Sequence, residues 1–561
     1  MADKTSMQDP ESLNSPKSPH RVDLDTILID EIGQFGWYQF KTVVLAVIVV
    51  IFAAWGASEY VFTTARINSR CFIPECETDP STSEFAPSWI LNAIPGTSET
   101  SFDSCQRYVN LTSSFDSSGT CPANLFDQNT IVNCDANVYQ NTDTVVYDFD
   151  LGCDEWRRSL IGSVRTAGTL TALPITGYIS DRWGRKTALV MNALNTAWLG
   201  VVRYWAGTYI GFMMSEIIEA TFGSAGFSCA YILLMELVGP KYRVAVGATM
   251  NTFFSVGQIL LGLIAWAVPN WQKLTLTLYI PQFLTISYIW LMSESIRWYM
   301  SKGRYDESET LLKKVAKVNG KELSEKSLKA LRETAEEDKQ RRAIEEAQKV
   351  TEPWLIVQVF RHKEILIRCC ISPVWWITNT FIYYGMSINA VNMSGNRYLN
   401  YVAVSAAEIP GYWTAVFLMG KIGRRPVLIA AFWICAACQI AYIFMPDALY
   451  GVALTMFLIG KFSIAMVMTS VYVYTAELYP TKYRHNLFAF SSMMGRIGSI
   501  IAPLTPAFGA ATFDDLPFVL FASFALLSGC LIFITPETLG TKLPDTMEEA
   551  SNIGKKKDVK S

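Results

Sequence analysis

Twelve long apolar runs, separated by mostly short polar segments, dominate the pattern of this chain. The first extends from Val43 to Phe62. About 20 apolar residues cross the ~30 Å hydrocarbon core of a bilayer as a helix, whereas a membrane-spanning strand needs only about ten alternating positions. The other runs lie at about Ser159–Ile179, Thr187–Tyr204, Tyr209–Leu237, Val244–Val268, Leu274–Met292, Leu366–Ile388, Tyr401–Met419, Val427–Met445, Leu449–Leu478, Leu487–Phe508 and Pro517–Thr535. The pattern predicts an all-α integral membrane protein with 12 transmembrane helices.

Composition agrees with this class. Hydrophobic residues make up 51% of the 561 positions and charged residues only 17%, whereas soluble chains carry about 25% charged residues. This deficit argues against a cytosolic multidomain enzyme. A net charge of -3 gives no reason to expect nucleic acid as a partner. The polar first forty residues lack the short apolar core of a cleavable signal peptide, so we expect a retained cytosolic N-terminus.

Basic residues on alternate short loops predict the orientation, because Lys and Arg accumulate on the cytoplasmic side. One set of loops holds Arg182, Arg185, Lys186, Lys241, Arg243, Lys421, Arg424, Arg425, Lys482 and Arg484. The alternate loops hold little more than Arg203, Lys273 and Arg397. Both termini are therefore expected in the cytoplasm. The expected organisation is a cytosolic tail (1–42), a first half (43–292), a cytosolic helical loop (293–365), a second half (366–535) and a cytosolic tail (536–561).

The loop between the first two spans, residues 64–156, is expected outside the cell. It carries six cysteines, which are Cys71, Cys76, Cys105, Cys121, Cys134 and Cys153. An even set in an extracellular segment predicts three disulfides, with fifteen pairings possible. A metal cluster is the alternative, but neither a CxxC pair nor a histidine accompanies these cysteines. Asn110-Leu111-Thr112 is a glycosylation sequon on the same side.

An internal repeat relates the two groups of six spans. The segments Glu236-Leu-Val-Gly-Pro-Lys-Tyr-Arg243 and Glu477-Leu-Tyr-Pro-Thr-Lys-Tyr-Arg484 share five of eight residues in register. Asp181-Arg-Trp-Gly-Arg-Lys186 and Gly420-Lys-Ile-Gly-Arg-Arg425 recur at nearly the same offset. Two related six-helix halves are typical of rocking transporters, which bind substrate between the halves. The charges at the inner ends of spans predict a cytoplasmic gate made of Asp181, Arg185, Glu236, Arg243, Glu477 and Arg484, with salt bridges between the halves that form in one state and break in the other.

The motifs also carry a family resemblance over nearly the whole chain. Gly177-Tyr-Ile-Ser-Asp-Arg-Trp-Gly-Arg-Lys186 resembles the signature loop of the major facilitator superfamily. Further segments resemble the organic cation, anion and carnitine transporter family: Gly33–Gln39, Cys71–Cys76, Asp103–Tyr108, Glu408–Pro410, Ala476–Thr481 and Pro536–Gly540. Three segments look most like its carnitine and zwitterion branch: Gly460–Phe462, Val471–Leu478 and Gly540–Thr546. The resemblance implies the major facilitator fold, a plasma-membrane location and transport of small organic ions.

Some positions depart from the family pattern. Ser293-Glu-Ser-Ile-Arg-Trp298 lacks both prolines of the family's Pro-Glu-Ser-Pro-Arg-Trp. Gly420 replaces an acidic residue, and Glu216 stands where the family usually has Arg. These differences concern the cytoplasmic contacts rather than the fold.

Ionisable residues inside spans cost about 3 kcal/mol each on insertion scales, so each needs a partner or a function. Arg165 lies at a depth similar to Glu216 and Glu219, which predicts either pairing within the first half or a substrate or coupling-ion contact. Arg496 lies near the membrane midplane, and Lys461 lies about twelve residues into span ten. Arg binds a carboxylate through two hydrogen bonds. In the family resemblance, an Arg at this position marks anion and carnitine transporters. The alternative for Arg496 is a structural pair with Glu408 or another acidic residue.

Aromatic residues of span seven complete the predicted site. Aromatic faces attract organic cations, and by resemblance Trp376 and Tyr383 line the family's cavity. Tyr412 stands where anion transporters tend to have Lys, which weakens a pure organic-anion interpretation. The candidate substrate-binding residues are Arg496, Trp376, Tyr383, Tyr384, Lys461, Tyr412, Arg165 and Glu219.

The sequence therefore predicts a transporter of small zwitterions or cations, such as carnitine or related amines, embedded in the lipid bilayer. No cofactor is expected. Sodium or proton coupling stays open at Glu59, Glu216, Glu219 or Glu408, since all three histidines lie outside the spans. An organic-anion exchanger and a non-transporting receptor on the same helix bundle are the alternatives. No catalytic or metal-binding motif indicates an enzyme. The oligomeric state cannot be predicted from these features.

Overall fold

The computed structural model describes residues 24–98, 101–111, 120–349, 354–446, 449–541, 543–544 and 546–554. It divides into two compact units. The first comprises residues 1–40, 237–242 and 296–352, and the second comprises residues 41–236, 243–295 and 353–561. Thr112 of the glycosylation sequon and the outer parts of both predicted tails lie outside the described residues.

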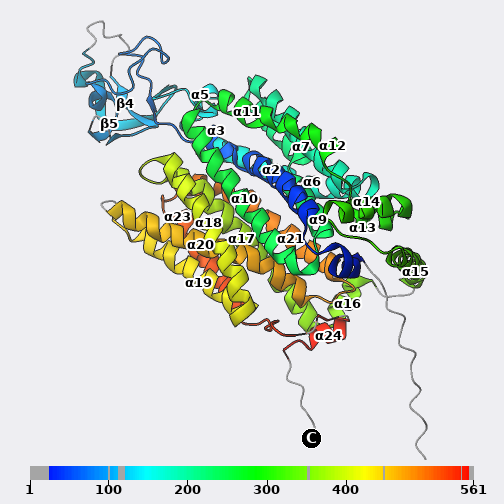
Figure 1. Cartoon of the computed structure of the whole chain (residues 1–561). Helices are drawn as coiled ribbons and strands as arrows, with labels where there is room; N and C mark the ends of the chain where they lie inside the picture. The colour runs from blue at the N-terminus through cyan, green and yellow to red at the C-terminus, as the bar shows by residue number, and fades with distance from the viewer. Residues whose placement is uncertain are drawn as a thin grey trace, which may run out of the picture. The chain divides into compact units, whose positions relative to one another are not determined.

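Helices of the first half occupy the second unit apart from a few terminal residues, and several spans are interrupted (Figure 1). Pro281 interrupts the sixth span, where a 3₁₀ segment replaces regular α-helix, because proline lacks the N–H of the α-helical ladder. The segments are α2 (Trp37–Ser58), α3 (Tyr60–Thr63), α6 (Glu155–Trp183), α7 (Arg185–Val202), η3 (Arg203–Trp205), α8 (Tyr209–Gly223), α9 (Gly226–Leu237), α10 (Pro240–Ala267), α11 (Trp271–Tyr279), η4 (Ile280–Ser287) and α12 (Tyr288–Leu291).

The second half repeats this arrangement after a short helix, α16 (Leu355–Arg361). Its eleventh span is broken near Pro503 and Pro506. The segments are α17 (Lys363–Asn389), η5 (Ala390–Asn392), α18 (Arg397–Ile422), α19 (Arg424–Ile443), α20 (Tyr450–Leu478), α21 (Arg484–Ile501), η7 (Ala502–Leu504), α22 (Thr505–Ala511), α23 (Leu516–Ile532) and α24 (Met547–Ser551).

Nine helical segments among the described residues are long and apolar enough to cross a membrane. The other three predicted runs are also helical, as α6, α7 and α23. Helix α6 carries Arg158, Arg165, Asp181 and Arg182 along its 29 residues, which lowers its mean hydropathy. Helix α23 is apolar but has only 17 residues. Twelve helical segments thus correspond to the twelve predicted runs.

In its described residues, the outer loop forms a small disulfide-linked β structure with three two-stranded sheets. Strand β1 (Ser69–Cys71) pairs with β6 (Asn137–Tyr139), β2 (Gly96–Ser98) with β3 (Ser101–Phe102), and β4 (Gln106–Asn110) with β5 (Phe126–Asn133), all antiparallel. Short helical segments accompany them: α4 (Ile90–Ala93), η2 (Ala123–Leu125) and α5 (Val145–Asp148). The bridges join Cys71 to Cys134, Cys76 to Cys121 and Cys105 to Cys153.

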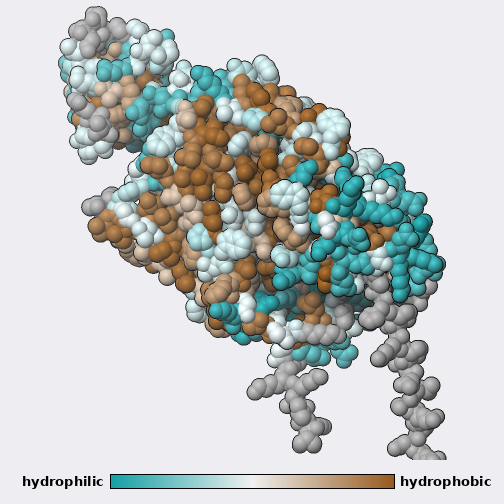
Figure 2. All heavy atoms as spheres, viewed as in Figure 1, coloured by the Kyte–Doolittle hydropathy of each residue, from teal (hydrophilic) through white to brown (hydrophobic). Residues whose placement is uncertain are grey.

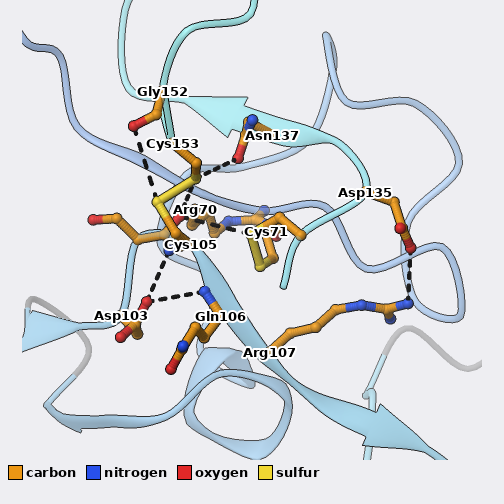
Figure 3. The surroundings of a disulfide bond; sticks show 12 residues. Arg70, Cys71, Asp103, Cys105, Gln106, Arg107, Asp135, Asn137, Gly152 and Cys153 are labelled. Carbon is orange, nitrogen blue, oxygen red and sulfur yellow. Dashed lines mark hydrogen bonds and ion pairs between the residues drawn. A yellow bond between two sulfur atoms is a disulfide. The ribbon is translucent and has the colours of Figure 1, made fainter. Parts of the chain in front are cut away.

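Figure 3 shows how the Cys105–Cys153 bridge is supported. Asp103 Oδ1 accepts hydrogen bonds from the backbone N–H groups of Cys105 (2.8 Å) and Gln106 (2.9 Å). Asn110, the predicted glycosylation site, ends β4. Among the described residues, no group of three or more His, Cys, Asp or Glu side chains is placed to hold a metal ion.

The first unit has its own apolar core. It contains α1 (Leu24–Ile27), the π-helical turn η1 (Leu28–Ile32), α13 (Ile296–Ser301), α14 (Tyr305–Val318) and α15 (Glu325–Lys349). Arg297 pairs with Asp25, and Glu31 accepts a hydrogen bond from the N–H of Ser324 (3.0 Å). The buried residues are Leu24, Ile27, Leu28, Ile32, Ile296, Leu311, Leu312, Val315, Ala316, Leu328 and Leu331. The predicted cytosolic helices therefore pack with the end of the N-terminal tail.

The helix bundle exposes many large apolar side chains, as lipid-facing surfaces do. Figure 2 shows hydrophobic atoms over α10 and α18, and hydrophilic atoms gathered over α14 and α15. Leu284 is 70% exposed and Trp290 is 76% exposed. Exposed apolar area of this extent is unfavourable in water but suits the hydrocarbon core of a membrane.

Candidate functional site

Two arginines and three glutamates form a buried ion-pair network in the first half. Arg165 on α6 pairs with Glu216 and Glu219 on α8. Arg203 pairs with Glu59, which precedes α3, and also lies 3.1 Å from Glu219. All five side chains are at most 4% exposed. Buried charges are strongly destabilising unless they are paired. In this structure Arg165 and Glu219 pair with each other within the first half, as one of the two predicted interpretations expects.

Arg203 is the one member of this network that the sequence did not predict inside the bundle. It was expected in a short outer loop, but it is fully buried in η3, directly after α7. Tyr279 OH and Thr275 Oγ1 each donate to the Glu59 carboxylate at 2.7 Å. The signal available from sequence was the isolated carboxylate of Glu59 inside a span, which requires a cation at the same depth.

A second buried polar cluster lies in the other half, around Glu408 on α18. Lys461 Nζ on α20 lies 3.0 Å from Glu408 Oε1 and also donates to the Tyr383 carbonyl at 2.7 Å. Tyr383 OH (2.7 Å) and Tyr412 OH (3.0 Å) donate to Glu408 Oε2. Ser255 on α10 donates to the same oxygen at 2.5 Å, so the cluster reaches the first half. Glu408 therefore pairs with Lys461.

The predicted aromatic residues of α17 differ in accessibility. Trp376 is 1% exposed and donates through Nε1 to Thr475 Oγ1 at 3.0 Å, and Tyr383 is 2% exposed. Tyr384 is half-buried. On α20, Tyr472 packs edge-to-face against Trp376, with ring centroids 4.8 Å apart, and is 42% exposed. Tyr384 and Tyr472 thus carry the accessible aromatic surface here, and Tyr472 was not among the predicted site residues.

Arg496 on α21 is half-buried, and α21 packs against α17, which carries Tyr384. The neighbouring Gly495 packs against Trp376, where an added Cβ would lie 3.2 Å from the indole ring. Among the residues that the structure describes, the Arg496 guanidinium has no hydrogen-bond or ion-pair partner. Arg165, Arg203 and Lys461 each have a glutamate partner. Arg496 therefore differs from these three basic residues, which are paired.

The cytoplasmic motif of the first half forms a network around Arg185. Its guanidinium bonds Asp181 at 2.6 Å and Glu236 at 3.1 Å. Glu294 accepts hydrogen bonds from the backbone N–H groups of Arg185 (2.8 Å) and Lys186 (3.0 Å), which begin α7. A carboxylate at this position satisfies N–H groups that lack partners within the helix. Glu294 belongs to the segment that has lost the family prolines.

The second half contains the same arrangement. Arg424 bonds Glu477 through two contacts of 3.1 Å, and Glu537 accepts from the N–H groups of Arg424 and Arg425 at 3.0 Å each. Arg484 Nη2 donates to Thr481 at 3.1 Å. The salt bridges found around Asp181, Arg185, Glu236 and Glu477 each join elements of one half, whereas the gate hypothesis expected bridges between the halves. Arg185 and Arg424 are paired with acidic residues of their own half.

Several contacts between the halves lie near their outer ends. Phe62 at the end of α3 stacks on Tyr398 of α18, with ring centroids 5.7 Å apart. Arg397 Nη1 donates to the carbonyl of Arg66 at 2.9 Å. Helix α6 packs against α21 and α22, where Trp156 and Phe508 have ring centroids 6.1 Å apart. These contacts close the bundle on the side of the outer loop.

Comparisons with known proteins agree with this geometry. The profile of the family described as "Sugar (and other) transporter" matches residues 118–549. The chain is 28% identical over 538 residues to the organic cation transporter protein of Drosophila melanogaster, covering 94% of this chain and 95% of the relative. It is 31% identical to human solute carrier family 22 member 2, covering 73% of this chain and 72% of the relative. An inward-open structure of the xylose transporter XylE from E. coli superposes with a TM-score of 0.60 at 14% identity, over 90% of this chain and 98% of that one.

Two six-helix halves around buried ion pairs define a membrane transporter with the major facilitator fold, as predicted. The chain belongs to the sugar (and other) transporter family, and its relatives include an organic cation transporter protein and a member of solute carrier family 22. These relatives are transporters and not enzymes, in agreement with the prediction. The profile and the similarities extend across both halves, so this conclusion applies to the bundle as a whole.

Proposed function

We propose that this chain moves small organic ions across the plasma membrane by alternating access, and that its preferred solutes are zwitterions or cations such as carnitine or related amines. The observation that carries the proposal is the half-buried guanidinium of Arg496, which has no partner among the described residues and follows Gly495, whose neighbour Trp376 packs against Tyr472. A carboxylate binds a guanidinium through charge-assisted hydrogen bonds, and an ammonium group is attracted to aromatic faces. A solute with both groups uses both features.

Arg496→Gln tests this proposal. Uptake of labelled carnitine, glycine betaine and a cationic dye is measured in cells that express the chain, with and without sodium and at several pH values. We expect Arg496→Gln to reduce carboxylate-solute uptake about tenfold or more, because a charge-assisted bond is lost. Lys273→Gln removes an equal charge at an exposed outer position and should leave uptake unchanged. Undiminished uptake by Arg496→Gln would contradict the proposed role.

An organic-anion exchanger is the second candidate, because the same free guanidinium suits a dicarboxylate. In that case labelled anions, and not zwitterions, would exchange against internal dicarboxylate, and Arg496→Gln would abolish the exchange. Dependence on external sodium or on a proton gradient would identify a coupling ion. Equal uptake under all conditions would indicate facilitated diffusion.

We further propose that the outer loop faces the extracellular side, with a glycan on Asn110 and both termini in the cytoplasm. Support comes from three disulfides in this loop, since disulfides persist in oxidising compartments. Glycosidase treatment should lower the apparent mass of the wild-type chain, and Asn110→Gln should abolish that change. A chain from intact cells that shows no glycosidase-sensitive mass would count against this orientation.

We propose the six charged residues of the paired inner motifs as parts of the cytoplasmic gate. In this arrangement the outer ends of the halves are in contact, and the described bridges of Arg185 and Arg424 hold each half together internally. Alternating access requires that contacts at one end form as those at the other end break. The motifs then act by keeping each half rigid while the two halves rock.

A further inference from the structure

A polar cavity of about 230 Å³ lies at the outer ends of the spans, apart from the Arg496 region. Its wall comes from both halves and from the outer loop. The lining residues include Phe62, Ala265, Asn141, Asp143, Arg397 and Tyr398. Cavities for drug-sized ligands are typically about 300 to 1,000 Å³, so this one suits only a small molecule.

Asp143 supplies the cavity with a fixed carboxylate. Its backbone N–H donates to Asn141 Oδ1 at 3.2 Å, and its carbonyl accepts from the N–H of Trp271 at 2.8 Å. The side chain is half-buried and has no hydrogen-bond or ion-pair partner in the described part of the chain. The anchored backbone keeps Asp143 at the cavity wall, and its unused carboxylate is an acceptor for a cation.

Arg397 supplies the opposite charge. Nη1 donates to the Arg66 carbonyl at 2.9 Å, which holds the side chain in place. The described residues offer its remaining N–H groups no acceptor, and Arg397 and Asp143 do not form an ion pair with each other although both line the cavity. The stacked rings of Phe62 and Tyr398 form another part of the wall.

We propose that this cavity is a second binding site, and that it takes a small zwitterion with its ammonium group on Asp143 and the aromatic rings and its carboxylate on Arg397. A free carboxylate and aromatic faces recognise a quaternary or protonated amine. The unused guanidinium donors recognise a carboxylate. A lone cation would leave Arg397 unmatched, and a lone anion would leave Asp143 unmatched.

Because both halves line the cavity, it can form only while their outer ends are together. A ligand that binds one arrangement and not the other shifts the population toward the first. The occupant therefore holds the outer side closed and slows turnover. This consequence depends on the alternating access proposed above, whereas binding to the cavity does not.

The test measures binding to the purified full chain through the shift of its thermal unfolding midpoint by glycine betaine. The Arg496→Gln background removes the proposed central site, so any remaining response reports another site. In this background we expect Asp143→Asn and Arg397→Gln each to weaken the apparent affinity about tenfold or more, through loss of one charge-assisted contact. Asp135→Asn is the control, because its carboxylate is 91% exposed in the same loop and does not line the cavity.

Each outcome decides the proposal. No response in the Arg496→Gln background, or an unchanged response in Asp143→Asn, overturns the second site. Choline binding as tightly as glycine betaine, with no effect of Arg397→Gln, overturns the zwitterion assignment in favour of a simple cation. Failure of the central-site proposal would be seen in a different measurement. Arg496→Gln would then leave uptake unchanged, independently of the effect of Asp143→Asn on the thermal shift.

Discussion

Pairing separates the charged residues of the spans into structural and available groups. Arg203 is buried against Glu59 and Glu219, whereas Arg496 is half-buried and has no partner among the described residues. A paired guanidinium resists displacement, because its removal leaves buried carboxylates without compensation. The half-buried, unpaired guanidinium is the one that we propose for solute binding, so residue type alone does not separate the two arginines.

Arg203→Gln tests this division. We expect a loss of about 3 to 5 kcal/mol in the free energy of unfolding, because Glu59 would stay buried without its cation. Thermal unfolding of the purified chain measures the effect. Arg157→Gln is the matched control, since Arg157 is 58% exposed and lies 3.7 Å from Asp154. Exposed pairs contribute about 0 to 1 kcal/mol. Equal stability of the two variants would show that the buried network contributes little.

At the scale of elements, most of the helical fold could be predicted from the sequence. Apolar runs as long as Val43–Phe62 predict membrane-spanning helices. The repeated Glu-Leu and Lys-Tyr-Arg positions predict that the two halves are related. The pairing of Glu408 with Lys461, and of Glu59 with Arg203, could not be predicted. Those contacts depend on the rotation of each helix about its axis and on where α7 gives way to η3, which one sequence does not determine.

The cytoplasmic motifs of both halves contain the same local arrangement, a glycine next to a carboxylate that binds the start of the following helix. Gly184 and Gly423 have φ values of +112° and +105°, and each lies beside the carboxylate that binds the next helix, Glu294 or Glu537. A side chain at either glycine would collide with that carboxylate. The glycines of the two signature loops are thus explained by local geometry on both sides of the repeat.

Glu294→Gln and Glu537→Gln should therefore have matching effects. Each variant weakens the charge-assisted bonds at the start of α7 or α19, at a cost of about 0.5 to 2 kcal/mol. We expect faster amide hydrogen exchange in the first turn of the affected helix only. Glu322→Gln, at an exposed position, is the control. Equal exchange in all variants would contradict a capping role for these carboxylates.

At the scale of the whole transport unit, the outer contacts predict a way to arrest turnover. Trp156 on α6 and Phe508 on α22 belong to different halves and have ring centroids 6.1 Å apart. Joining Trp156→Cys and Phe508→Cys with a short bifunctional thiol reagent should hold the outer side closed and abolish uptake, because alternating access needs that side to open.

Each single-cysteine variant treated with the same reagent controls for modification without cross-linking, and also for the exposed native thiols of Cys370 and Cys530. Uptake that continues after complete cross-linking would show that the halves need not separate at this point. The comparison also tests the outer cavity, because a closed outer side preserves its walls. The same cross-link is then made in the Arg496→Gln variant. The cross-linked variant should still show the shift of its thermal unfolding midpoint by glycine betaine, although the cross-link stops uptake.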